Sequence, residues 1–270
     1  MLLFLFIDRE IMSELKREDI LSINQNGWNK AAPLFYAGTA LPEYGPLVPT
    51  ENDLQLIPNL NGGKVLELGC GSGHSLVYLL ENRNARELWG LDISEEQIRM
   101  AQDLLQSKLI SANLLASSMD ENHGIPKDYF DLVIAIYALG CTPDLAKTLQ
   151  LIHSYLRPGV MFIFSWEHPM YQSLSYESSL GKYVFENSYL QEGPVLNPAW
   201  KGVEIVINHR KLSTYLNAII QAGLLLDQMI EPEPHAWKAR KQDIDPSKWY
   251  NFARAQLMST TFIVKSHKAN

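Results

Sequence analysis

The sequence predicts an α/β fold with a doubly wound parallel sheet and helices on both faces. Short apolar segments with strand character alternate with helix-like segments, and the first such strand runs directly into a glycine-rich turn. Alternation of this kind produces parallel β-α-β units with right-handed crossovers. With 270 residues, 46% of them hydrophobic, the chain is long enough for one large domain or two small ones.

The elements follow from apolar patterning and capping residues. We expect strands at 64–68, 87–92, near 109–116, 130–136 and 160–165, and helices at 13–32, 51–58, 75–82, 94–105 and 144–156. Ser94 and Gln97 have the spacing of a helix cap. The last third departs from the alternation, with strands in 183–208, a helix at 213–222, and strands at 224–230 and 257–265.

No segment reads as a clear linker. We therefore predict an N-terminal extension and cap over 1–50 and a main domain over 51–270, with a lid insertion at about 167–210. Aromatic residues gather in three segments that could converge as a lid: Trp28, Phe35, Tyr36 and Tyr44; Tyr171, Tyr176, Tyr183, Phe185, Tyr189 and Trp200; Trp237, Trp249, Tyr250 and Phe252. Alternatively, these side chains cover helices or form a homodimer interface.

Composition excludes several classes of protein. The net charge of -7 argues against a nucleic-acid partner, and the basic run Lys238, Arg240, Lys241 is followed by acids and reads as solvated surface. Two cysteines without metal-ligand spacing indicate a reducing cytoplasm and no metal site. Residues 1–7 are apolar but too short for a membrane span, and they lack the basic start and cleavage site of a signal peptide. Because a more ordinary start follows at Met12, we expect 1–11 either to be disordered or to precede the true start at Met12.

A glycine turn follows the first predicted strand. Gly69, Gly71 and Gly73 form a G-x-G-x-G pattern, and glycines allow positive φ and close approach of a ligand to the backbone. Asp92 ends the next strand 19 positions after Gly73, where a carboxylate can accept both hydrogens of a ribose diol. A purely structural turn would leave Asp92 unexplained.

Glu67 distinguishes between two classes of ligand that bind to folds with this kind of turn. Nicotinamide enzymes use G-x-G-x-x-G with the helix N-terminus facing a pyrophosphate. A carboxylate two residues before the first glycine would repel a pyrophosphate, but it suits the amino group of a methionine moiety. The turn therefore favours S-adenosylmethionine over a dinucleotide.

These motifs resemble those of class I S-adenosylmethionine-dependent methyltransferases. Segment 65–73 resembles the first motif, 90–94 the acidic motif, 130–133 the fourth-strand motif and 156–159 the turn before the fifth strand. More loosely, the chain resembles bacterial small-molecule methyltransferases. The resemblance implies a Rossmann-like sheet of seven strands, mostly parallel with the last one antiparallel.

The resemblance also implies roles for particular residues. The expected cofactor-binding residues are Glu67, Gly69, Cys70, Gly71, Gly73, Asp92, Ile93, Gln97, Ser118, Met119, Asp120, Ala135, Ile136 and Tyr137. In this reading Glu67 and Gly69 contact the methionine part, Asp92 the ribose and Ile93 the adenine. Ser118, Met119 and Asp120 share the adenine edge in an unusual order. Ala135, Ile136 and Tyr137 lie near the transferred methyl, and Tyr137 offers a π face or only packs.

Catalytic and substrate residues are less marked. His168 follows the fifth strand and could act as a general base, or it could be a structural histidine in a Glu-His-Pro turn. Cys141 lacks the Pro-Cys context of a nucleophile. The candidates for the substrate pocket and lid are Trp28, Tyr36, Tyr44, Trp200 and His209.

The predicted function is methyl transfer to an O, N or C atom of a small-molecule acceptor, with S-adenosylhomocysteine as the product. The Asn/Asp-Pro-Pro-Tyr motif of amino-methylating enzymes is absent, which again argues against a nucleic-acid acceptor. The alternative is a non-catalytic protein that binds S-adenosylmethionine or S-adenosylhomocysteine as a sensor or partner subunit. A dinucleotide oxidoreductase is a distant third.

Overall fold

The computed structural model describes residues 15–36, 41, 43–235, 245–246 and 248–270. The apolar segment 1–7, the start at Met12, Trp237 and the basic run Lys238, Arg240, Lys241 lie outside the described residues. The division into a cap over 1–50 and a main domain over 51–270 stays a prediction. None of the helices in the described part of the chain has the length and apolar character needed to span a bilayer.

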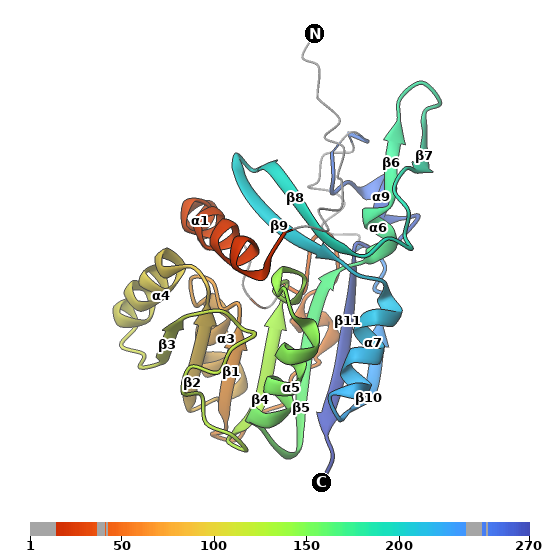
Figure 1. Ribbon diagram of the computed structural model, residues 1–270. Helices are drawn as coiled ribbons and strands as arrows, with labels where there is room; N and C mark the ends of the chain where they lie inside the picture. Colours follow the sequence, from red (N-terminus) through yellow and green to blue (C-terminus); the bar gives the residue numbers. More distant parts are fainter. Residues whose placement is uncertain (1–14, 37–40, 42, 236–244, 247) are drawn as a thin grey trace.

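A seven-stranded sheet lies at the centre of the molecule (Figure 1). Its order is β3 (Asn113–Ala116), β2 (Glu87–Asp92), β1 (Lys64–Leu68), β4 (Phe130–Ile136), β5 (Leu156–Glu167), β11 (Thr261–Lys268) and β10 (Leu224–Ile230). The strands from β3 to β5 are parallel, and β11 is antiparallel to both β5 and β10. The predicted mostly parallel, Rossmann-like sheet with an antiparallel last strand is confirmed.

Helices cover both faces of this sheet. The helices α2 (Glu51–Leu54), α3 (His74–Arg83) and α4 (Glu95–Ser107) belong to one face, and α5 (Leu145–Tyr155) and α7 (Leu212–Gln221) to the other. Two short elements, η1 (Leu139–Cys141) and α6 (Pro169–Gln172), lie between these helices in sequence, and a third, α9 (Phe252–Ala255), lies between β10 and β11. Successive strand residues alternate between the two apolar layers, as the pleat requires.

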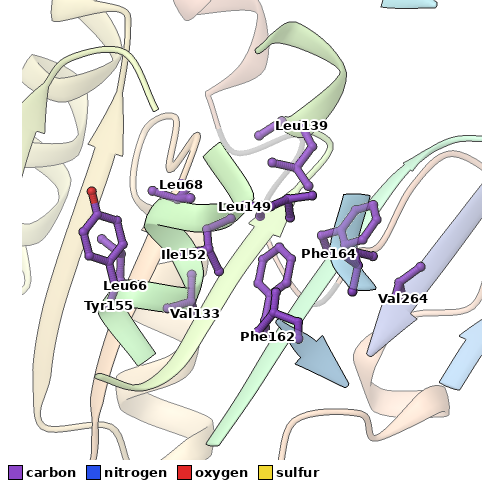
Figure 2. Packing of buried hydrophobic residues seen from close by; sticks show 14 of the residues in the cluster. Leu66, Leu68, Val133, Leu139, Leu149, Ile152, Tyr155, Phe162, Phe164 and Val264 are labelled. Atoms are coloured by element: carbon purple, nitrogen blue, oxygen red, sulfur yellow. The ribbon is translucent and has the colours of Figure 1, made fainter. Parts of the chain in front are cut away.

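The layer beneath α5 is the largest of three buried apolar clusters in the described part of the chain. Figure 2 shows Phe162 and Phe164 of β5 in one layer with Leu149 and Ile152 of α5, and Val133 of β4 next to Ile152. All five side chains are fully buried. Because aromatic and aliphatic side chains of this size contribute about 2–5 kcal/mol each when buried, this layer fixes β4 and β5 side by side.

A helix and a hairpin lie beyond the carboxyl ends of the parallel strands (Figure 1). Here α1 (Arg17–Phe35) packs against the hairpin of β8 (Gly193–Trp200) and β9 (Val203–His209). Asn24 of α1 is buried and bonds to the hairpin backbone in both directions. Its Nδ2 donates to the Val206 carbonyl at 3.0 Å, and its Oδ1 accepts from the Val206 amide at 2.7 Å. A further hairpin consists of β6 (Leu174–Glu177) and β7 (Lys182–Phe185).

Several predicted boundaries were wrong, two for local reasons and one because of a distant strand. The helix predicted over 51–58 stops at Leu54, because Gln55 is left-handed and the Glu51 carboxylate accepts the amides of Leu56 and Ile57. The third strand is limited to Asn113–Ala116, since Leu109 forms a turn with positive φ. The last strand runs over Thr261–Lys268 rather than 257–265, because its polar end pairs with β10.

Candidate functional site

The glycine turn joins β1 to α3 and is strained for any other residue. Gly69, Gly71 and Gly73 have φ of 71°, 50° and 79°, in the left-handed region that favours glycine. A Cβ at position 69 would lie 2.4 Å from the Cβ of Ala138, but one at position 71 would meet nothing closer than 3.7 Å. The turn therefore packs against the end of β4 on one side and is open at Gly71.

Glu67 is the buried polar group nearest this turn. Only 2% of it is exposed, and its Oε2 atom has no hydrogen-bond partner within the described residues. Burial raises the pKa of Glu67 to about 8, a rise that the Ser75 hydroxyl opposes and Asp92 reinforces. An unpaired buried carboxylate oxygen is costly, so the site calls for a donor from a ligand.

Asp92 connects the second strand to the turn. Its Oδ2 accepts from the Gly71 amide and its Oδ1 from the Ser94 amide, both at 2.9 Å. Burial raises the pKa of Asp92, although these backbone donors oppose the rise. Gln97 is buried and accepts the Ser72 hydroxyl at 2.6 Å, so its side chain braces the turn from α4. Ile93 follows Asp92 and is partly exposed.

Asp120 has a partner that the sequence analysis missed. Arg17 of α1 donates Nε to Oδ2 at 2.7 Å and Nη2 to Oδ1 at 2.8 Å, and the Ser118 hydroxyl also donates to Oδ1. Burial alone would raise the pKa of Asp120, but Arg17 and Ser118 outweigh it and hold the pKa below its usual range. This carboxylate therefore anchors α1 to the loop after β3, with partly buried Met119 beside it.

The carboxyl end of β4 lies at the same edge of the sheet as the glycine turn. Ala135 and Ile136 are buried, and Tyr137 has a φ of 53° that turns its side chain across the strand end. Its hydroxyl forms a 2.7 Å hydrogen bond with Thr261 Oγ1. Burial and the nearby charge of Glu167 raise the pKa of Tyr137 well above its ordinary value, so the side chain is a neutral phenol.

His168 uses both ring nitrogens within the fold. Nε2 is 2.7 Å from Glu231 Oε1, and Nδ1 accepts the Met170 amide at 3.2 Å as the cap of α6. Burial lowers the pKa of His168, and Glu231 opposes the change. In this arrangement neither ring nitrogen of His168 is left to take a proton from a substrate. Burial also raises the pKa of Cys141 to about 12, which disfavours a thiolate nucleophile.

The predicted lid residues form two aromatic clusters. In the first, Trp28 and Phe35 of α1 pack on Trp200 of β8 with ring centroids 5.1 and 5.2 Å away. In the second, Tyr171 packs on Trp249 and Tyr250 at 6.1 and 6.0 Å. The N-terminal helix thus meets the insertion, and the insertion separately meets the connection before β11.

The other predicted pocket residues are dispersed. Tyr36 packs against His74 at the start of α3, next to the glycine turn. Tyr44 is fully buried and donates to Glu51 Oε2 at 2.6 Å, so it belongs to the core rather than to a surface lid. His209 ends β9 and lines a small surface cavity with Arg210 and Tyr189.

Glu167 is a buried acid that the sequence analysis did not select. It ends β5 with 6% of its surface exposed, and its Oε1 accepts from Trp249 Nε1 at 2.6 Å and from the Tyr250 hydroxyl at 2.5 Å. The sequence of the Glu167-His168-Pro169 stretch pointed to its histidine as a candidate base, and no local pattern distinguishes Glu167.

Comparison with known proteins places this geometry in a family. A family model described as a methyltransferase domain matches residues 59–215. The chain belongs to this methyltransferase family.

Individual relatives agree with this assignment. An S-adenosylmethionine-dependent methyltransferase of Mesorhizobium loti is 28% identical, with a TM-score of 0.65 over 80% of this chain and 95% of that one. An uncharacterized Haemophilus influenzae protein is 31% identical over 66% of this chain and 74% of its own. A Mycobacterium leprae phthiotriol/phenolphthiotriol dimycocerosates methyltransferase is 29% identical over 50% of this chain, which spans 47% of that protein.

The methyltransferase is therefore an S-adenosylmethionine-dependent enzyme, and S-adenosylmethionine is its cofactor. A non-catalytic binding protein is not favoured. The residues present fit this cofactor, because the unpaired, buried Oε2 of Glu67 suits a donor such as the amino group of the methionine moiety. The open approach at Gly71 leaves space for a ligand next to the backbone.

Proposed function

We propose that this enzyme transfers the methyl group of S-adenosylmethionine to a small-molecule acceptor at the carboxyl edge of β1, β2, β4 and β5. The single observation that carries the proposal is the unpaired, buried Oε2 of Glu67 at the end of β1. A buried acceptor without a donor is expected to cost about 1–3 kcal/mol, which a bound ammonium group would offset.

The other roles follow from position. Gly69, Gly71 and Gly73 lie against the methionine part, and Asp92, which already orders the turn through Gly71, receives the ribose hydroxyls. Ile93, Ser118 and Met119 border the adenine. Asp120 contributes through its pair with Arg17, which holds α1 over this side of the sheet. Ala135, Ile136 and Tyr137 border the reacting methyl.

When bound, the cofactor supplies an electrophilic methyl group. The protein's contribution is to orient the acceptor in line with the carbon–sulfur bond of this methyl group and to exclude water. Positioning of the two reactants alone can increase the rate greatly. The α1 helix and the β8–β9 hairpin lie beyond the strand ends, and the Asn208 and Arg210 side chains tie the hairpin to the carbonyl of Thr142. This closed arrangement and the net charge of -7 favour a small acceptor over a nucleic acid.

Calorimetric titration with S-adenosylhomocysteine tests the binding half of the proposal. We expect Glu67→Gln and Asp92→Asn each to weaken binding by about 10- to 100-fold, as for a lost hydrogen bond to a charged group. Glu95→Gln is the matched control, since Glu95 is exposed in the first turn of α4. Equal affinity of wild type and Glu67→Gln would refute the assignment of Glu67.

Turnover is tested with labelled S-adenosylmethionine and an extract of small metabolites from which macromolecules have been removed. Transfer of label to a compound in the extract, lost in Asp92→Asn, supports the proposal. Label transfer only to added RNA or protein would contradict the small-molecule acceptor while leaving the binding result intact.

A further inference from the structure

The side chain of Glu167 lies among aromatic side chains at the end of β5. Trp249 and Tyr250 hold its Oε1, as described above. Among the residues that the structure describes, no donor is hydrogen-bonded to the other oxygen, Oε2. Because the residue is only 6% exposed, an Oε2 without a donor in the protein is available to accept a hydrogen bond from a ligand.

This carboxylate lies next to the end of β4. The Tyr137 amide donates to the carbonyl of Ser165, two residues before Glu167, so the ends of β4 and β5 are aligned. Glu167 also pairs in register with Thr261, whose hydroxyl bonds to Tyr137. The Tyr250 hydroxyl contacts both Glu167 and Tyr137. Tyr137, Tyr250 and Glu167 therefore form one cluster, with the Trp166 ring 5.5 Å from that of Tyr137.

We propose that Glu167 holds the acceptor through Oε2 and receives its proton, and that the acceptor is a hydroxyl group on a planar apolar ring. This inference rests on the proposed methyl transfer. The rings of Tyr137, Trp166, Trp249 and Tyr250 favour a flat apolar body, and the single carboxylate disfavours an anionic acceptor.

The chemistry of proton release favours a hydroxyl over an amine. A buried carboxylate stabilises an amine as its ammonium form, which has no lone pair with which to attack. A hydroxyl keeps its lone pairs while donating to Oε2. As the oxygen–methyl bond forms, the methyl–sulfur bond breaks with its electron pair left on sulfur, and the acceptor proton passes to Glu167 and then to solvent. Atoms and charge balance without a further reactant.

Paired ligands test this proposal on the protein loaded with S-adenosylhomocysteine. The probes are 2-naphthol, its methyl ether 2-methoxynaphthalene, and 2-(aminomethyl)naphthalene. We expect wild type to bind 2-naphthol about 10- to 100-fold more tightly than the ether, and Glu167→Gln to lose most of this preference. The side-chain amide in the Glu167→Gln variant keeps an oxygen that can accept from Trp249 and Tyr250, so these two hydrogen bonds can be retained. Glu186→Gln is the control, with the same charge change at an exposed site of the insertion.

Several outcomes would overturn the proposal. These are an unchanged preference in Glu167→Gln, no binding of 2-naphthol to wild type, or tighter binding of the amine than of 2-naphthol. A loss of S-adenosylhomocysteine binding in Glu167→Gln would also overturn it, because Glu167 would then support the fold of the site. In the turnover assay with labelled S-adenosylmethionine and the metabolite extract, the rate of label transfer should fall by about 10²- to 10⁴-fold in Glu167→Gln. If wild type fails to bind S-adenosylhomocysteine, the proposed function itself fails.

Discussion

Gly27 of α1 approaches Glu204 of β9 so closely that a Cβ at position 27 would lie 2.1 Å from the Glu204 carbonyl oxygen. The contact is with backbone, which cannot rotate away as a flexible side chain could. The neighbouring Asn24 amide bonds to Val206 from the same helix face. The glycine at position 27 lets α1 approach the β8–β9 hairpin closely, and the side-chain amide of Asn24 holds the two together.

We expect Gly27→Ala to separate α1 from the hairpin and to destabilise the protein by about 1–3 kcal/mol, as for overpacking of a buried site. Alanine is the better helix former, so a destabilised variant would show that the close approach outweighs helix propensity. Urea unfolding followed by circular dichroism measures the change. Asn26→Ala on the exposed side of α1 is the control, and equal stability of Gly27→Ala and wild type would contradict this close packing.

The raised pKa of Glu67 predicts a pH dependence of stability. The folded protein keeps a proton on Glu67 up to pH about 8, whereas the unfolded chain releases it near 4.5. The stability due to this proton is complete below the lower value and is lost as pH rises through the upper one. We expect the free energy of unfolding of ligand-free wild type to fall relative to Glu67→Gln between these values. Parallel curves for the two proteins would show that Glu67 is ionised throughout.

Removal of Arg17 leaves the buried Asp120 carboxylate without its main partner. Arg17 is 37% exposed and Asp120 fully buried, so we expect Arg17→Met to cost about 1–2 kcal/mol, less than for a fully buried pair. Because the pKa of Asp120 is held low, the loss should be full near neutral pH and shrink as acid protonates Asp120. Thermal unfolding at several pH values measures this effect. Lys30→Met, an exposed change on the same helix, should leave stability unchanged.

The His168→Asn variant tests whether His168 has a structural or a catalytic role. An asparagine oxygen can take over the cap of α6 that Nδ1 provides, but it cannot act as a base. We expect the rate of label transfer from S-adenosylmethionine to the metabolite extract to stay within about twofold of wild type, whereas loss of a general base lowers the rate by about 10²- to 10⁴-fold. A loss of that size with normal S-adenosylhomocysteine binding would restore His168 as the base.

Local sequence patterns were sufficient to predict the parallel strands of the sheet and the glycine turn. The strands that begin near residues 64, 87 and 130 are predominantly apolar, and a G-x-G-x-G pattern follows the first, so both features can be predicted from neighbouring residues alone. Glu67 and Asp92 could be selected because their position relative to the turn determines where their side chains lie.

Long-range pairs could not be predicted in the same way. Asp120 was placed at the adenine edge, yet its partner Arg17 is 103 positions away. Glu167 is bound by Trp249 and Tyr250, 82 and 83 positions later. No periodicity or spacing connects residues so far apart, since their contact depends on how the insertion and the connection before β11 fold back over the sheet edge.

The position of β11 inside the sheet has a consequence for synthesis of the protein. Its residues lie between β5 and β10, so the edge of β5 stays unpaired on the ribosome until Thr261–Lys268 have been made. At about 5–20 residues per second, the stretch from Glu167 to Thr261 takes roughly 5–20 s to translate. During that time an apolar strand edge is exposed in the nascent chain, and a chaperone that shields β5 would improve the yield of folded enzyme.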